Sequence, residues 1–245
     1  MHKTYIFDYG GTLDTGGDHW GRVIWHAYER AGIPVGEEQF REAYVFAERK
    51  LGSEPIIKPS FTFRETLHTK LQIEMEHLGI NEGLTKVLDD LYALTQKQTA
   101  ASREVLLKLR ETATLALVSN FYGNLRTVLS EFHLDDLFTV VVESAAVGIR
   151  KPDPAIYRLA LTELESNYKT QSSRFNGQGS ECNHNCQLSI LNSQLTVVGD
   201  SMKNDIQPAK ELGLYTIQIS GEPWDNINTT GISADRVITN LKELL

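Results

Sequence analysis

Hydrophobic residues follow two different spacings along this chain, and the change between them divides the sequence. A short apolar run over residues 4–8 predicts a first β-strand. From residue 20 to residue 109, apolar residues instead recur three and four positions apart, as in Val23-Ile24, Ala27 and Ala31, which is typical of helices. Glycine and proline residues punctuate this region and separate the expected helices from one another.

Beyond residue 110 the pattern changes to short buried strands that alternate with helices. The apolar runs predict strands at 115–118, 138–142, 195–198 and 215–219, and helices at 125–132, 154–161 and 206–212. Strands and helices that alternate at these lengths indicate a parallel sheet covered by helices on both faces. We therefore expect an α/β fold, a Rossmann-like doubly wound parallel sheet with an inserted all-helical cap domain.

The helical block interrupts the α/β domain directly after its first strand. We predict a discontinuous core of residues 1–16 and 101–245, and a helical cap of residues 17–100. Caps of this kind commonly close over a site and exclude water, although a purely structural appendage would give the same pattern. Residues 166–193 are rich in Asn, Gln and Ser, and we expect them to form a long polar loop inserted in the core.

The composition is that of an ordinary globular protein and excludes some partners. The 245 residues are enough for a full core, and 24 Lys and Arg against 32 Asp and Glu give a net charge of −8. That charge argues against nucleic acid or an anionic membrane as partner, because both require clustered cations, but it leaves room for a small anionic substrate in a local pocket. Oligomeric state is not indicated.

The two cysteines bear on location and on metal binding. Cys182 and Cys186 cannot form a disulfide framework, and the N-terminus reads as a strand rather than a signal peptide, so we expect a cytoplasmic protein. No apolar stretch is long enough for a membrane span. His184 lies between the cysteines and could complete a soft-metal site, but three possible ligands without a second cluster do not match a zinc-finger pattern.

Polar residues with catalytic potential follow the predicted strands at their carboxyl ends. Asp8 ends the first strand, Ser119-Asn120 follow the next, and Asp200 follows a later one, with Asp205 close behind. Lys151 lies in a loop, within Gly148-Ile149-Arg150-Lys151-Pro152-Asp153-Pro154. The carboxyl ends of parallel strands meet at one edge of a sheet, so we expect these residues to converge on one crevice.

This set of side chains suits phosphoryl transfer. The Asp8 carboxylate can attack phosphorus, and Asp8 with Asp200 offers the oxygen ligands that Mg²⁺ prefers. The Ser119 hydroxyl, backbone N–H groups near Asn120 and the Lys151 ammonium can hold the phosphoryl oxygens. We expect Asp205 to orient Lys151 or a metal-bound water.

The order of these segments resembles the four motifs of the haloacid dehalogenase superfamily. Motif I is matched by Asp8-Tyr9-Gly10-Gly11-Thr12-Leu13, motif II by Leu117-Val118-Ser119-Asn120, motif III by the Lys151 loop, and the last motif by Val198-Gly199-Asp200-Ser201-Met202-Lys203-Asn204-Asp205-Ile206. The helical insertion matches the family's cap between motifs I and II. The resemblance implies a Mg²⁺-dependent phosphatase of small phosphorylated metabolites, acting through an aspartyl-phosphate.

The resemblance also implies a role for each matched residue. Asp8 would be the nucleophile, and Lys151 would assist catalysis and bind phosphate. The remaining phosphate binders would be Gly11, Thr12, Ser119 and Asn120. The metal ligands would be Asp8, Asp200, Asp205 and the backbone carbonyl of Gly10.

Gly10 departs from the family pattern, in which phosphatases carry a second aspartate at this position. That aspartate protonates the leaving alcohol and then activates water, and its loss would remove a general acid–base contribution of about 10²- to 10⁴-fold. Asp14, Asp18 or His19 could substitute from the following loop, although turn roles for the two aspartates and a capping or packing role for His19 are the simpler interpretation of each.

Three other interpretations of Gly10 stay open. Relatives that cleave carbon–phosphorus bonds also lack the acid and use a cap lysine as a Schiff base. Lys50, Lys58 and Lys70 are candidates, although a solvated surface position is the simpler interpretation of each. The branch that removes halide from 2-haloacids has tyrosine at this position, which Gly10 does not match. A catalytically weakened member that binds a phosphorylated metabolite or a protein is the last alternative.

Overall fold

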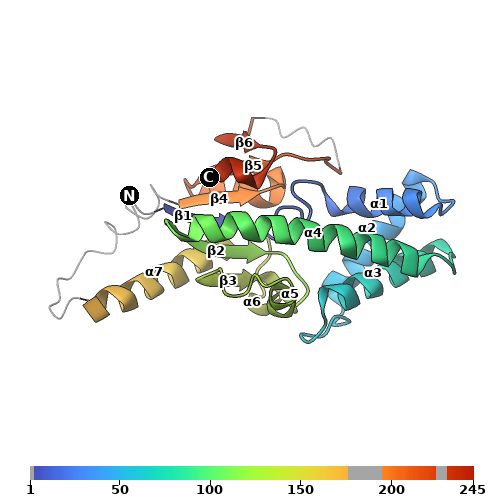
Figure 1. Cartoon of the computed structure of the whole chain (residues 1–245), viewed down its shortest axis with the longest axis horizontal. Helices are drawn as coiled ribbons and strands as arrows, with labels where there is room; N and C mark the ends of the chain where they lie inside the picture. The colour runs from blue at the N-terminus through green and yellow to red at the C-terminus, as the bar shows by residue number, and fades with distance from the viewer. Residues whose placement is uncertain (1–2, 176–194, 225–230) are drawn as a thin grey trace.

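A six-stranded parallel sheet carries the candidate site at one edge (Figure 1). The computed structural model describes residues 3–175, 195–224 and 231–245. The strands lie in the order β3-β2-β1-β4-β5-β6. Their bounds are β1 Lys3–Phe7, β2 Ala113–Ser119, β3 Val140–Glu143, β4 Leu195–Gly199, β5 Tyr215–Ile219 and β6 Arg236–Ile238. The first strand therefore lies in the middle of the sheet, between β2 and β4.

Alternate residues of each strand serve the two faces of the sheet. Tyr5 and Phe7 face a core that contains residues of α4 (Leu84–Arg110) and α5 (Leu125–Glu131). Ile6 faces the opposite core, which contains residues of α7 (Ala155–Phe175) and α9 (Gln207–Glu211). Both faces are buried, as expected for a parallel sheet, and this confirms the predicted α/β class.

The insertion after β1 is entirely helical, as predicted. It contains α1 (Trp20–Ala31), α2 (Glu37–Ser53) and α3 (Phe63–Leu78), and it leads into α4. A Thr62–Glu65 capping box begins α3, which satisfies two backbone donors that the helix would otherwise leave free. In Figure 1 these helices form a separate layer beyond the end of the sheet that carries the site.

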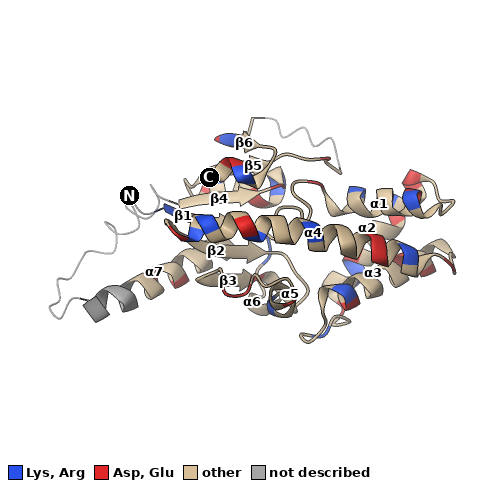
Figure 2. Cartoon of the chain, in the orientation of Figure 1, with Lys and Arg blue, Asp and Glu red and all other residues tan. Residues whose placement is uncertain are grey.

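Helix α4 joins the cap to the core as one element of 27 residues. It packs against α1 and α3 at one end and against β2 at the other. Residue 100, which we predicted as the last residue of the cap, lies inside this helix. Blue and red residues both occur along α4 in Figure 2, so neither sign of charge dominates it.

Several elements differ from the sequence prediction. Helix α7 continues to Phe175, so residues 166–175 are helical rather than part of a loop. The predicted helix at 206–212 begins with a π-helical turn, Met202–Ile206, before α9. Strand β6 was not predicted. The rest of the polar segment, with Cys182, His184 and Cys186, lies outside the described residues. Within the described ranges, we find no helix with the length and apolar character needed to cross a bilayer.

Candidate active site

Three neighbouring strands deliver polar residues to the same edge of the sheet. Asp8 follows β1 directly, and its N–H donates to the Val198 carbonyl at 2.9 Å. Ser119 is the last residue of β2, and Asp200 comes directly after β4. Because β1 pairs with both β2 and β4, the structure brings these residues together as the sequence predicted.

Lys151 reaches the same point from the loop between α6 (Ser144–Val147) and α7. Its Nζ donates to Asp8 Oδ1 and to Asp205 Oδ1, each at 2.7 Å, and to the Val118 carbonyl at 3.2 Å. The residue is only 4% exposed. A lysine that is buried with two carboxylate partners is a fixed part of the site rather than a solvated surface residue.

Asp205 holds Lys151 in place, as predicted. Besides the ammonium, its Oδ1 accepts the Tyr157 hydroxyl at 3.2 Å, and its Oδ2 accepts the Ser201 N–H at 3.0 Å. Asp205 is fully buried. Its two oxygens therefore have fixed directions, which in turn fix the position of the Lys151 ammonium.

The site has more buried negative charge than positive charge. Burial raises the pKa of Asp8, while the Lys151 ammonium opposes that rise. The pKa of Asp200 lies well above its usual value because burial and the carboxylates of Asp205 and Asp8 disfavour its charged form. Burial alone would lower the pKa of Lys151, but Asp205 and Asp8 outweigh it and keep the amine protonated.

This donor set fits a divalent cation. One oxygen from each of Asp8, Asp200 and Asp205 lies within 4.8 Å of the others. The three carboxylates have a single ammonium among them, so a bound cation would relieve the surplus charge. An all-oxygen set of this kind suits hard divalent cations, of which Mg²⁺ is one.

Gly11 is required by the close approach of Asp200. The residue has φ +92°, and a Cβ at this position would lie 2.5 Å from Asp200 Oδ1. Thr12, the next residue, donates its hydroxyl to Asp200 Oδ1 at 3.0 Å and accepts the Asp200 N–H at 3.1 Å. In this structure the two residues therefore hold Asp200; phosphate binding by them stays a prediction.

Ser119 and Asn120, at the end of β2, have different surroundings. Ser119 is buried beside the site, whereas the Asn120 side chain hydrogen-bonds to the backbone of Lys151. Asn120 also lines the cavity described next. Phosphate binding by Ser119 and by the backbone near Asn120 likewise stays a prediction.

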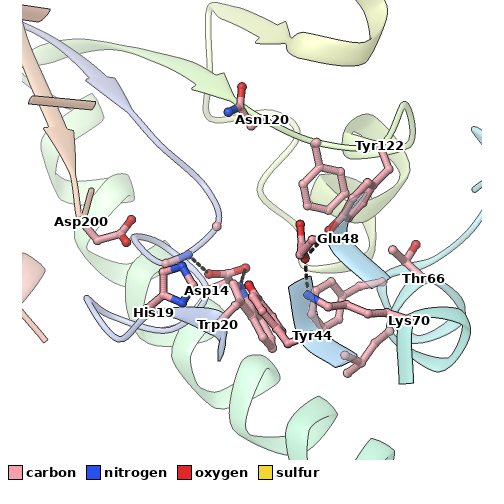
Figure 3. Close-up of a pocket in the computed structure, with 15 residues that line it drawn as sticks. Asp14, His19, Trp20, Tyr44, Glu48, Thr66, Lys70, Asn120, Tyr122 and Asp200 are labelled. Carbon is pink, nitrogen blue, oxygen red and sulfur yellow. Dashed lines mark hydrogen bonds and ion pairs between the residues drawn. The ribbon is translucent and has the colours of Figure 1, made fainter. Parts of the chain in front are cut away.

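A cavity of about 160 Å³ separates the strand ends from the cap (Figure 3). The core contributes Gly10, Gly11 and Asp200 to its wall, and the cap contributes aromatic and charged side chains that include Trp20, Tyr44, Glu48 and Lys70. A cavity that is lined by both domains and reaches the turn after Asp8 is the expected place for a small ligand.

Lys70 lines this cavity, so the surface position that we favoured for it from the sequence is wrong. The residue is 6% exposed, pairs with Glu48, and has its Nζ 4.2 Å from the centre of the Tyr44 ring. Glu48 also accepts the Tyr122 hydroxyl at 2.8 Å. The other two candidate lysines are not in the cavity wall: Lys58 is exposed and Lys50 half-buried.

Asp18 and His19 have the structural roles that the sequence offered as the simpler interpretation. Asp18 Oδ1 accepts the Glu222 N–H at 2.7 Å. His19 caps α1, its Nδ1 accepting the Gly21 N–H at 3.0 Å, and its ring stacks on Trp224. Burial lowers the pKa of His19 to about 4, so its imidazole is neutral at physiological pH.

Asp14 lies in the cavity wall, although sequence reasoning did not single it out from its neighbours. It is 2% exposed, it lines the cavity, and its carboxylate accepts two hydrogen bonds: Oδ1 from the Gly11 N–H at 2.7 Å and Oδ2 from the Trp20 indole at 2.9 Å. Burial raises its pKa to about 7, and the two hydrogen bonds only partly offset burial. Spacing alone could not distinguish a buried carboxylate from an ordinary turn residue here.

Comparison with known structures agrees with this fold. The HAD-hydrolase YfnB of Bacillus subtilis, solved bound to magnesium, is 17% identical with a TM-score of 0.53, over 99% of this chain and 96% of that one. A HAD phosphatase from Thermococcus onnurineus is 18% identical with a TM-score of 0.52, over 99% and 95%. At these identities the similarity shows a shared fold.

Sequence comparison identifies the family. Haloacid dehalogenase-like hydrolase domain-containing protein 3 of Mus musculus is 28% identical over 171 residues, which are 67% of this chain and 59% of the mouse protein. The chain thus matches somewhat over half the length of that relative. The family model for haloacid dehalogenase-like hydrolases matches residues 2–213. This protein is a member of the haloacid dehalogenase-like hydrolase family.

Proposed function

We propose that this protein is a Mg²⁺-dependent phosphatase that hydrolyses a small phosphorylated metabolite through an aspartyl-phosphate on Asp8. One observation carries the proposal: the Lys151 ammonium lies 2.7 Å from Asp8 Oδ1, and Asp8 belongs to the one carboxylate cluster among the described residues that could hold a cation. Nucleophile, cation site and phosphate-binding ammonium are thereby close enough to act on a single phosphoryl group.

The chain's own residues account for the first part of the reaction. Asp8 attacks phosphorus, and the bond to the leaving oxygen breaks. Lys151, fixed by Asp205, neutralises charge on the phosphoryl oxygens, with Ser119 and the Asn120 backbone as further donors. A bound Mg²⁺ would supply additional charge neutralisation from Asp8, Asp200, Asp205 and the Gly10 carbonyl.

A small substrate fits both the cavity and the charge of the protein. About 160 Å³ of space beneath the cap suits a metabolite rather than a macromolecule. The net charge of −8 disfavours nucleic acid and anionic membrane as partners. We expect the cap side chains to contact the leaving group of the substrate.

The test is release of p-nitrophenol from p-nitrophenyl phosphate, with and without Mg²⁺. We expect turnover by the wild type that requires Mg²⁺, and a loss of at least about 10³-fold in Asp8→Asn, which lacks the nucleophile. Asp135→Asn, an exposed aspartate in a loop of the core, is the matched control and should keep full activity. A wild type that binds phosphate but turns over no ester would instead identify a binding protein.

Hydrolysis of a carbon–phosphorus bond is the second candidate, because Lys70 lies in the cavity wall. Schiff-base formation requires an amine that is free to attack a carbonyl, whereas the Lys70 side chain is bound in an ion pair with Glu48. Borohydride reduction in the presence of a carbonyl-bearing phosphonate would trap a Schiff base on Lys70, detected as added mass on that residue. We expect no such adduct.

A further inference from the structure

The glycine at position 10 leaves space beside the nucleophile. A Cβ built on Gly10 would meet one side chain within 4 Å among the described residues beyond its chain neighbours, the Trp20 indole, at 3.9 Å from Cδ1 and 4.0 Å from Nε1. The Cβ of a side chain at this position would therefore lie next to the Trp20 indole, 4.0 Å from its N–H nitrogen. In the wild-type chain no side chain of residue 10 competes for that donor.

The Asp14 carboxylate already takes that donor. Its Oδ2 lies 2.9 Å from Trp20 Nε1, the atom that would lie 4.0 Å from a Cβ on residue 10. Its Oδ1 accepts the Gly11 N–H at 2.7 Å, the amide of the peptide bond that follows Gly10. These two hydrogen bonds hold the carboxylate of Asp14 between the Gly11 N–H and the Trp20 indole, and Figure 3 shows Asp14 next to Trp20 in the cavity wall.

We infer that Asp14 is the general acid–base residue of this protein, acting from four residues further along the chain than the missing aspartate. The inference rests on the proposed function, since it assigns a role within that reaction. Its basis is a shared hydrogen-bond donor: Trp20 Nε1 binds Asp14 and is also the one polar atom of the described residues, beyond the chain neighbours, within 4 Å of a Cβ on residue 10.

Asp14 gives up one proton in the first step of the reaction and regains one in the second. In the first step an Asp8 oxygen bonds to phosphorus, the ester P–O bond breaks, and the protonated Asp14 carboxyl gives its proton to the leaving oxygen, which departs as the alcohol. In the second step the Asp14 carboxylate takes a proton from water, and the water oxygen attacks phosphorus. Asp8 is released, inorganic phosphate forms, and Asp14 is protonated again.

Other titratable groups in the cavity are engaged elsewhere. Glu48 is bound to Lys70 and Tyr122, and the His19 Nδ1 accepts the backbone N–H of Gly21. Asp200 accepts the Thr12 hydroxyl beside the cation site. Asp14 has neutral donors as its hydrogen-bond partners, and a pKa of about 7 provides both protonation states near neutral pH.

The experiment compares two substrates that differ in their need for an acid. p-Nitrophenolate can leave without being protonated, whereas the butoxide of butyl phosphate needs a proton in order to leave. We expect Asp14→Asn to lower kcat/KM for butyl phosphate by about 10²- to 10⁴-fold. With p-nitrophenyl phosphate the same variant should release a rapid burst of p-nitrophenol equal to the enzyme concentration and then slow, because water activation is lost and the aspartyl-phosphate accumulates.

Restoring the carboxyl at residue 10 is the complementary test. In the Asp14→Asn background, Gly10→Asp should raise kcat/KM for butyl phosphate at least tenfold above that of Asp14→Asn alone. In the wild-type background the same substitution should add little, since the two carboxyls would share one donor. If Asp14→Asn is poorly folded, Trp20→Phe releases Oδ2 instead and should lower butyl phosphate turnover about tenfold more than p-nitrophenyl phosphate burst formation.

The outcomes separate this inference from the proposed function. Retention of butyl phosphate turnover within about threefold in Asp14→Asn, or equal losses on both substrates without a burst, would overturn the role of Asp14 while the phosphatase stands. A wild type that is inert on both esters, or whose turnover survives Asp8→Asn, would overturn the proposed function itself.

Discussion

Asn120 holds the backbone of Lys151 at both of its polar groups. Its Oδ1 accepts the Lys151 N–H at 2.9 Å, and its Nδ2 donates to the Lys151 carbonyl at 3.0 Å. Asn120 directly follows β2, so this pair of hydrogen bonds ties the Lys151 loop to the central strands of the sheet. The position of the ammonium beside Asp8 depends on this attachment as well as on Asp205.

Asn120→Ala is therefore expected to lower kcat. Loss of both hydrogen bonds frees the Lys151 loop, and a displacement of about 1 Å at a catalytic group can cost about 10²-fold. We expect kcat for p-nitrophenyl phosphate to fall 10- to 100-fold, with a smaller change in KM. Gln72→Ala, on the exposed side of α3, is the control and should leave both constants unchanged. An unchanged kcat in Asn120→Ala would show that Asp205 positions Lys151 without help.

Gly11→Ala should destabilise the fold and weaken the cation site together. The new Cβ would lie within 2.6 Å of the Asp200 carboxylate, at a φ of +92° that side chains rarely adopt. We expect a loss of roughly 1–3 kcal/mol in the free energy of unfolding, measured by urea denaturation.

Gly148→Ala is the matched control for that prediction. Gly148 has φ +69°, but a Cβ there would meet nothing within 4 Å, so the variant isolates the backbone penalty. Equal losses in the two variants would mean that the contact with Asp200 contributes nothing.

Glu74 should make stability fall with rising pH. It is fully buried in α3, its Oε1 has no hydrogen-bond partner, and burial raises its pKa from 4.5 to about 7. The folded protein then binds the proton more tightly than the unfolded chain, so this carboxyl lowers the free energy of unfolding as pH rises from about 4.5 to about 7.

Glu74→Gln removes that charge and should be stabilising at high pH. We expect its gain over wild type to be larger at pH 8 than at pH 5, by up to roughly 3 kcal/mol in urea denaturation. Glu76→Gln, on the exposed side of the same helix, should show no such pH-dependent gain. A gain that is equal at both pH values would contradict the buried charge as its cause.

Magnesium should stabilise the protein against unfolding. A ligand that binds only the folded state adds about 2.7 kcal/mol at a hundredfold excess over its Kd, and thermal unfolding would show this as a higher Tm. Without Mg²⁺, Asp200→Asn should be more stable than wild type, because it relieves repulsion from Asp205 and Asp8, but it should gain less from Mg²⁺. A wild-type Tm that does not respond to Mg²⁺ would argue against the cation site.

Elements with strong local signals could be predicted from the sequence. The central strands are continuous apolar runs because both faces of the sheet are covered, and β5 lies where its run predicted it. Strand β6 could not be predicted, because it has three residues and only Ile238 is buried. The end of α7 was missed since its polar composition resembles a loop, and helical spacing is visible only where one face packs on the core.

Some residues of the candidate site could likewise be predicted from the sequence, and others could not. Asp8, Ser119 and Asp200 could be placed because strand ends in a parallel sheet converge, and Lys151 because its loop resembles a family motif. The burial of Asp14 and Lys70 could not be predicted. Both are polar residues, and their burial depends on how the cap packs over the core rather than on local sequence.

The continuity of α4 has a consequence for anyone who shortens this protein. A helix of 27 residues extends about 40 Å. Removing the cap domain up to residue 100 would cut α4 within its length. The remaining piece, which leads into β2, would begin without an N-cap residue. A deletion variant meant to isolate the core should therefore keep α4 whole. The α4 side chains that pack against α1 and α3 should be replaced by polar ones.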